Sequence, residues 1–263
     1  MFDLQAQAEP RKMQRARGVA RIGFDDGRLT TLSQSGSAKV MLPSVHRAMP
    51  EAVFLNTAGG LTGGDRFEFS AHVTGGALLA TTQTAERAYA STGAEADVTV
   101  SLTVGADATL LWLPQETILF ENSALRRRTR IDAAPGARVL ALETLVFGRA
   151  AMGETLSAFS LNDRRELYAP GPVWVDAVSL DAAALGQAAG LRDARAIATL
   201  LYWAPDAADV LNGLPLPDGC AASAWDGKLV IRAAASDLWP LKRALTPLIE
   251  RLSGGVLPRV WAA

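Results

Sequence analysis

The 263-residue chain is poor in the side chains that most often bind metals, form disulfides or act as nucleophiles. Its one cysteine, Cys220, excludes an intramolecular disulfide framework. Its two histidines, His46 and His72, lack the spacing of a metallohydrolase helix, and one cysteine with two histidines cannot build a typical structural zinc site. No Gly-x-Ser-x-Gly elbow occurs either. We therefore expect no catalytic residues and no tightly bound cofactor, and a surface role for His72.

Long apolar runs and a strong net charge are also missing. No stretch approaches the roughly 18 apolar residues that a transmembrane helix needs. The N-terminal sequence MFDLQAQAEPRKMQRARG lacks the apolar region of a signal peptide. The formal net charge is -1, which argues against a protein that coats nucleic acid. These absences predict a cytoplasmic protein whose partners are neither nucleic acid nor membrane.

Alternating strand patterns dominate the first two thirds of the chain. Hydrophobic residues make up 49% of the sequence and charged residues 20%, so a sizeable core can form. Period-two alternation is clear over 67–73 and 98–104, and it predicts strands with one buried face. Shorter strands are expected at 19–24, 29–33 and 39–42, with Asp25-Asp26-Gly27 as the hairpin turn between the first two. We predict a mainly β chain that forms a single domain over residues 1–263.

About two helices are expected. Residues 181–191 are Ala-rich, although Gly186 and Gly190 weaken the helix pattern. The stronger prediction runs from Ser236 as N-cap to Leu252, with Gly254 as the stop. Its leucines form one apolar stripe at helical spacing, which favours packing against the body of the protein. Pro247 is expected to kink or shorten this helix.

A weak internal repeat combines a strand, a glycine turn and a second strand. The turn glycines Gly75, Gly105 and Gly136 lie about 30 residues apart, within the range of stacked, solenoid-like architectures. Polar residues follow the second strand of each unit, so stacking of the units would bring these side chains together. They are Gln83 and Glu86, then Gln115 and Glu116, then Glu143. An ordinary β-meander with accidental spacing remains the alternative.

The run from Asn56 to Asp65 is the most unusual segment. Four glycines permit positive φ angles and close backbone approach. No Gly-Lys-Ser/Thr ends the run, and a strand rather than a helix follows it, so nucleotide binding is excluded. We expect a tight structural loop. Its defining residues are Asn56, Thr57, Gly59, Gly60, Thr62, Gly63, Gly64 and Asp65.

Charged residues embedded in strand-like sequence are the candidate functional residues. They are Gln83, Glu86, Arg87, Gln115, Glu116, Glu143, Arg149 and Glu154. Buried charges need partners, and Arg87 and Arg149 are expected to pair with the glutamates. The set fits either a structural ion-pair network or a polar passage through the protein. Paired carboxylates also occur in glycosidases, so a carbohydrate-active β-fold hydrolase is the enzymatic alternative.

These segments together resemble the urease accessory protein UreD family, also called UreH. The Asn56–Asp65 run is the family's most recognisable signature, and it is followed in order by Gln83–Arg87, by Leu113–Ile118 and by the segment 148–154. The resemblance covers essentially the whole chain and is loosest over 180–227.

The resemblance implies an elongated, mostly β fold of stacked strands with two helices. It also implies a chaperone subunit that joins the UreF and UreG proteins on apo-urease and assists GTP-dependent nickel insertion. The GTPase activity would belong to UreG. Nickel would pass through this chain in transit, without tight binding, along a polar passage lined by the candidate residues.

Overall fold

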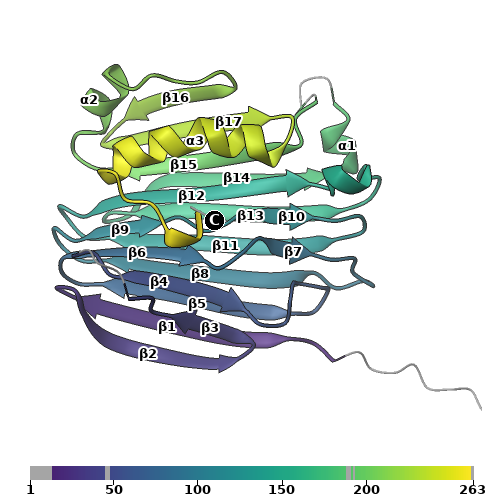
Figure 1. The fold of residues 1–263 in the computed structure, drawn as a ribbon, viewed down its shortest axis with the longest axis horizontal. Helices are drawn as coiled ribbons and strands as arrows, with labels where there is room; N and C mark the ends of the chain where they lie inside the picture. Colours follow the sequence, from purple (N-terminus) through teal and green to yellow (C-terminus); the bar gives the residue numbers. More distant parts are fainter. Residues whose placement is uncertain (1–13, 45–47, 188–190, 192, 262–263) are drawn as a thin grey trace, which may run out of the picture.

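The structure is a computed structural model that describes residues 14–44, 48–187, 191 and 193–261. Two β-sheets stack face to face, and one long helix covers the outer face of the larger sheet (Figure 1). The fold is mainly β, as the alternation predicts. Among the described helices, none has the length and hydropathy needed to cross a membrane.

The smaller sheet has seven strands in the order β14-β13-β11-β8-β5-β1-β2. Its strands are β1 (Arg17–Asp25), β2 (Arg28–Gly36), β5 (Arg66–Val73), β8 (Ala96–Val104), β11 (Ala124–Ala133), β13 (Ser160–Tyr168) and β14 (Pro172–Asp181). The β1–β2 hairpin turns at Asp26-Gly27, where φ is 45° and 75°. Two consecutive positive φ angles match the twist of a tight hairpin, so the predicted turn is confirmed.

The larger sheet has ten strands, of which eight follow the order β16-β17-β15-β12-β9-β6-β4-β3. Its strands are β3 (Ala38–Met41), β4 (Glu51–Asn56), β6 (Ala77–Thr82), β7 (Glu86–Ala88), β9 (Thr109–Trp112), β10 (Thr117–Leu119), β12 (Arg138–Phe147), β15 (Ala196–Trp203), β16 (Cys220–Trp225) and β17 (Lys228–Ala235). Two strands remain: β10 pairs with both β12 and β7, and β7 pairs with β10.

The repeating units alternate between the two sheets. The turns at Gly75, Gly105 and Gly136 carry the chain from β5 to β6, from β8 to β9 and from β11 to β12. Within each sheet the successive strands pair in parallel. A meander would pair successive strands antiparallel in one sheet, so this part of the chain is not a meander. The arrangement is compatible with a solenoid-like stack.

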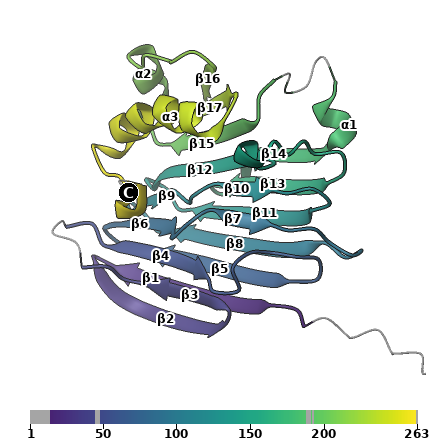
Figure 2. The same ribbon diagram turned by 45° about the vertical axis from the view of Figure 1, so that its right-hand side comes forward.

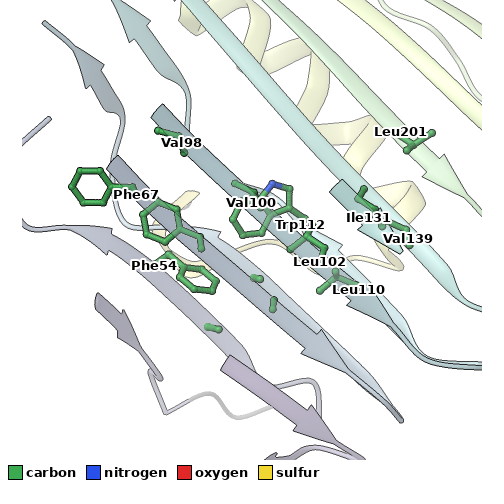
Figure 3. Packing of buried hydrophobic residues seen from close by; sticks show 14 of the residues in the cluster. Phe54, Phe67, Val98, Val100, Leu102, Leu110, Trp112, Ile131, Val139 and Leu201 are labelled. Atoms are coloured by element: carbon green, nitrogen blue, oxygen red, sulfur yellow. The ribbon is translucent and has the colours of Figure 1, made fainter. Parts of the chain in front are cut away.

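The main core lies between the sheets. Inward-facing residues of both sheets form it, and the rings of Phe54, Phe67 and Trp112 lie within it (Figure 3). Phe54 contacts Phe69 and Trp112 edge to face, with ring centroids 5.6 and 5.8 Å apart. Such inward alternation from both sheets is how a sandwich forms one continuous apolar layer.

A second core lies between the larger sheet and α3 (Leu238–Ser253). Leu241, Leu245 and Leu248 are buried there, so the predicted packing of the stripe is confirmed. The N-cap is Asp237, whose side chain accepts from the Leu238 amide at 2.7 Å, and the expected cap Ser236 was therefore one residue early. Gly254 ends the helix in the left-handed conformation, as predicted.

The other helical predictions need correction. Pro247 does not shorten α3, which runs on to Ser253, and this proline lies exposed on the outer side of the helix. The Ala-rich segment forms only α1 (Ala182–Leu185), which ends before Gly186, and residues 188–190 lie outside the described part. A third helix, α2 (Ala207–Asn212), was not predicted. Short 3-10 turns occur at Ala150–Met152 and Arg259–Trp261.

The larger sheet is broken along one line, and this break positions the polar residues. Residues 83–85 separate β6 from β7, and residues 113–116 separate β9 from β10, while β12 runs through unbroken. At the break, the backbone leaves the regular ladder, so β6 and β7, and likewise β9 and β10, are separate strands (Figure 2). The candidate residues of the first two units lie at or beside these breaks.

Candidate functional site

A small cavity lies between the sheets at the break. Its volume is about 50 Å³, and its polar lining includes Glu86, Gln115, Arg127 and Glu143. The rest of the wall is largely apolar, with Phe69 and Trp112 among its residues. Stacking of the units has thus brought together one polar residue from each of the three repeats, as the sequence analysis predicts for stacked units. Arg127 was not predicted.

Arg127 is the charged centre of this cavity. It lies on β11 and is buried, and its guanidinium contacts Glu143 at 2.8 Å. It also binds Asp163 through two nitrogens, at 3.0 and 2.7 Å, and donates to the Thr117 hydroxyl at 3.0 Å. The expected partners of Glu143, Arg87 and Arg149, are therefore corrected to Arg127. A buried carboxylate pairs with a cation of the opposite sheet because that cation points into the same layer.

The carboxyl groups beside Arg127 differ in their proton affinity. Burial raises the pKa of Glu143, and the nearby Arg127 guanidinium opposes part of this rise. The pKa of Asp163 is lowered, because attraction to Arg127 and the bidentate hydrogen bonds outweigh its burial. Asp163 therefore serves as the fixed anion of the pair, while Glu143 is the easier of the two to protonate.

Glu86 joins this cavity to the surface. It lines both the inner cavity and a second one of about 70 Å³, whose other polar lining residues include Asn56, Gln83 and Arg87. The Asn56 amide donates to both Glu86 carboxylate oxygens, at 3.2 and 3.3 Å. Burial nevertheless raises the pKa of Glu86 to about 7. Near neutral pH this carboxyl group therefore exchanges its proton readily.

The glycine-rich loop forms the rim of the outer cavity. Asn56 holds the loop by accepting from the Ala58 amide at 2.9 Å and donating to the Gly60 carbonyl at 3.0 Å. Asp65 closes its far end, because its carboxylate accepts from the amides of Ala16 and Thr62 at 2.7 and 2.8 Å. The side chain of Thr57 bonds the Ser37 carbonyl, and that of Thr62 bonds the Ala90 carbonyl. These hydrogen bonds hold the loop in place and set Asn56 against Glu86.

Two glycines of this loop are required for different reasons. Gly60 has a φ of 153°, and a Cβ there would collide with the Tyr89 ring. Gly63 does not have a positive φ, so backbone strain is not its reason. A Cβ at Gly63 would instead collide with the Ser91 hydroxyl and the Ala94 carbonyl. Gly59 and Gly64 adopt positive φ angles of 82° and 90°.

The outer wall of the break is closed by α3 and the C-terminal turn. Gln115 donates to the Val260 carbonyl at 3.0 Å and accepts from Lys242 at 2.8 Å. Glu116 is buried and pairs with Lys242 at 2.8 Å, so its partner is again not an arginine. Trp261 donates to the Leu113 carbonyl at 3.3 Å. These contacts fix the loop between β9 and β10 from outside.

The remaining candidates lie apart from the cavity lining. Arg149 and Glu154 pair with each other at 2.8 Å near the connection between β12 and β13. The Arg149 hydrogen bonds hold the pKa of Glu154 at about 2. This pair confirms one of the predicted contacts between an arginine and a glutamate. His72 is exposed on β5, as predicted, whereas His46 lies outside the described residues.

The charged chain continues beyond the cavity. Arg165 contacts Asp163 at 3.3 Å and Asp176 at 3.2 Å, and Asp176 contacts Arg232 at 2.6 Å. Sequence reasoning missed these residues, although a signal was present. Within β11, Arg127 has the same parity as the buried Leu125 and Ile131. Asp163 and Arg165 share the parity of Leu161 and Leu167 in β13. Charges at core-facing positions indicate buried ion pairs.

The size of the inner cavity limits what it can hold. A water molecule needs roughly 10–15 Å³ of such space, so about 50 Å³ holds roughly three. Glu86 and Glu143 bring carboxylate groups to this largely apolar wall, and carboxylate oxygens are suitable ligands for a divalent cation. Within the described part of the chain, no group of three or more His, Cys, Asp or Glu side chains has the geometry of a metal site.

Comparison with known proteins places the chain in a family. The family model described as "UreD urease accessory protein" matches residues 16–262. The chain belongs to the UreD family. A relative from Jannaschia sp., named urease accessory protein UreD, is 49% identical over 94% of this chain and 96% of its own length. A relative of the same name from Cereibacter sphaeroides is 52% identical over 89% of this chain and 89% of its own length. Another from Rhizobium leguminosarum is 40% identical over 99% of both chains.

The UreD family membership agrees with the resemblance drawn from the motifs. The matched region begins just before β1 and includes every strand and helix of the fold. It therefore contains the glycine-rich rim, the sheet break and the buried charges around Arg127.

Proposed function

We propose that this chain is a chaperone subunit of urease maturation. In this proposal it binds apo-urease together with UreF and the GTPase UreG, and assists GTP-dependent insertion of nickel in the cytoplasm. The chain itself carries no catalytic role. Its membership in a family of urease accessory proteins supports the assignment.

We further propose that nickel crosses this chain through the polar cavities at the sheet break. The observation that carries this idea is the position of Glu86, which lines both the outer and the inner cavity. A cation arriving at the rim of the loop would meet Gln83 and Glu86 first, and Gln115 and Glu143 next. Oxygen ligands replace part of the water shell that a divalent ion gives up.

Weak and stepwise binding is expected along this route. The inner cavity has room for about three waters, so an ion enters it only after losing part of its hydration shell. The Arg127 guanidinium repels a cation and prevents tight capture, while Glu143 and Asp163 offset that repulsion. Transfer requires release as well as binding, and nearly all available ligands are oxygens, which hold nickel less tightly than histidine or cysteine would.

The paired carboxylates do not favour the glycosidase alternative. A glycosidase needs two carboxyl groups on opposite sides of a bound sugar ring. Space for about three waters is too small for such a ring, and Glu143 is engaged by Arg127. We therefore expect the pure chain to hydrolyse neither glycosides nor GTP above the level of a mock preparation.

The test of the passage separates transport from assembly. Glu86→Gln keeps the shape of the side chain and its contact with Asn56 but removes the negative charge. Glu154→Gln is the matched control, because Glu154 lies outside the cavity lining. We expect Glu86→Gln to lower the nickel content of urease while pull-down of apo-urease stays normal, and Glu154→Gln to leave nickel content unchanged. Full nickel loading by Glu86→Gln would contradict the proposed route.

A further inference from the structure

The two sheets differ in width, and this leaves one inner face uncovered. The seven-stranded sheet ends at β14, whereas the larger sheet continues past it through β15, β17 and β16 (Figures 1 and 2). Arg232 of β17 still contacts Asp176 of β14, so β17 lies near the last position that the smaller sheet covers. β16 extends beyond this position. Its inner-face residues Ala221, Ser223 and Trp225 are all exposed.

The outer edge of β14 faces this uncovered surface. Among the described strands, β14 pairs only with β13, so its other edge is available to a further strand. Neighbouring strands lie about 4.8 Å apart and stacked sheets about 10 Å apart. One added strand would therefore lie opposite β17 and β16, and would complete the smaller sheet.

An apolar pocket lies at the end of this surface where β14 begins. Its volume is about 290 Å³, and its walls include Pro170 before β14, Trp203 at the end of β15 and Gly227 before β17. Such a pocket accepts one bulky apolar side chain, which is the usual form of an interface anchor. We refer to the outer edge of β14, the inner face of β16 and this pocket together as the β14 groove.

We propose that the β14 groove binds an extended segment of a different protein, which adds a strand to β14. Small or apolar side chains at alternate positions of that segment would face Ala221 and Ser223. A bulky apolar side chain at its end would enter the pocket beside Trp203. An acidic side chain is the complement for Arg232, whose side chain is half exposed. Backbone hydrogen bonds would supply affinity, and the alternate side chains would supply specificity.

A second copy of this chain does not fit the groove. Antiparallel pairing of β14 with its own copy would continue the smaller sheet through a two-fold axis. Both copies would then carry their larger sheets on the same side. Each larger sheet extends past β14, so the two overhanging faces would occupy the same space. The occupant is therefore a different chain, presented as an isolated strand.

The experiment rests on the proposed role in urease maturation and uses purified apo-urease and purified UreF as separate probes. Amide hydrogen exchange is measured over residues 173–181 for the full chain alone and in each complex. We expect one of the two partners to slow exchange in β14. Ser223→Arg places a long cation where the added strand would lie. Ser33→Arg makes the same change at an exposed serine of β2, which is the edge of the smaller sheet opposite β14.

Ser223→Arg is expected to weaken binding of the protecting partner about tenfold or more, while Ser33→Arg leaves it unchanged. Equal binding by the two variants, or complexes without protection of β14, would overturn this inference alone. A homodimer that Ser223→Arg dissociates would overturn it as well. Failure of the wild-type chain to bind either partner would overturn the proposed function itself.

Discussion

Glu86 combines partial burial with a contact that does not neutralise it. Asn56 donates to its carboxylate, but an amide offsets less of the burial cost than a cation would. Its folded-state pKa of about 7 lies above the ordinary glutamate value of 4.5. The folded protein therefore holds this proton more tightly than the unfolded chain, and the free energy of unfolding falls as pH rises between about 4.5 and 7.

We predict that Glu86→Gln removes this pH dependence. The variant should gain stability over the wild type as pH rises from 5 to 8, by at most about 3 kcal/mol, and should match it at pH 4.5. Denaturant unfolding at several pH values measures the difference. A constant difference across this range would show that Glu86 titrates normally.

Glu143, unlike Glu86, forms an ion pair, because the buried guanidinium of Arg127 contacts its carboxylate. Glu143→Leu would leave the Arg127 guanidinium with only Asp163, which Arg165 also contacts. We predict a loss of about 3–5 kcal/mol in the free energy of unfolding. The double variant Arg127→Met with Glu143→Leu should recover part of this loss, because it removes the unpaired charge.

Glu116→Leu is the control for this prediction. Its partner Lys242 is partly exposed and also contacts Gln115, so water and the amide can replace the carboxylate. We expect a smaller loss, and chemical denaturation compares the variants directly. Equal losses for Glu116→Leu and Glu143→Leu would contradict the special role of the buried pair.

At the level of strands and helices, periodicity predicted more than capping did. The alternation over 67–73 corresponds to β5, where Phe67, Phe69, Ala71 and Val73 are all buried. The leucine stripe of α3 was also found, because both patterns report burial directly. The periodicity predicted neither the N-cap of α3 nor the continuation of the helix through Pro247. Both depend on local backbone geometry, which a hydrophobic pattern does not report. Helix α2 has six residues, too few for a period to show.

The α3 stripe provides a prediction at this scale. Leu245 is 1% exposed between α3 and the larger sheet. Leu245→Ala should lower the free energy of unfolding by about 2–5 kcal/mol, because it leaves a cavity in the second core. Arg243→Ala, on the exposed side of the same helix, should change it by less than about 0.5 kcal/mol. Thermal and denaturant unfolding of both variants measure this contrast, and similar effects would place α3 outside the cooperative core.

For the molecule as a whole, the repeat explains why part of the site was predictable. Units of about 30 residues stack in parallel, so equivalent positions meet, and Glu86, Gln115 and Glu143 come together. The site's cations were not predictable in the same way. Arg127 belongs to the opposite sheet. Packing between the sheets decides which of their strands lie over one another, and the sequence repeat does not contain this information. Arg149 and Glu154 lie outside the cavity lining, because they follow the end of β12 and are not part of the stacked strands.

The free edges of the two sheets should govern how the isolated chain behaves in solution. All nine residues of β2 are exposed, and no other described strand pairs with its outer edge. Leu29 and Leu32 add exposed apolar area, and Arg28 at one end is the only charge in this strand. Natural proteins usually protect such an edge with a charge or a proline. We therefore expect the isolated chain to self-associate through β2.

Thr31→Glu tests this expectation, because it places a charge at the centre of β2 on an exposed position. Thr92→Glu adds the same charge to an exposed loop and keeps the net charge of the two variants equal. Light scattering at increasing protein concentration should show less association for Thr31→Glu than for Thr92→Glu, with unchanged circular dichroism for both. The formal net charge of -1 gives little electrostatic repulsion between molecules. An equal decrease in association for the two variants would therefore assign the effect to net charge alone. Improvement confined to Thr31→Glu would assign it to strand pairing, because only that variant puts a charge where a neighbouring strand would have to form its ladder.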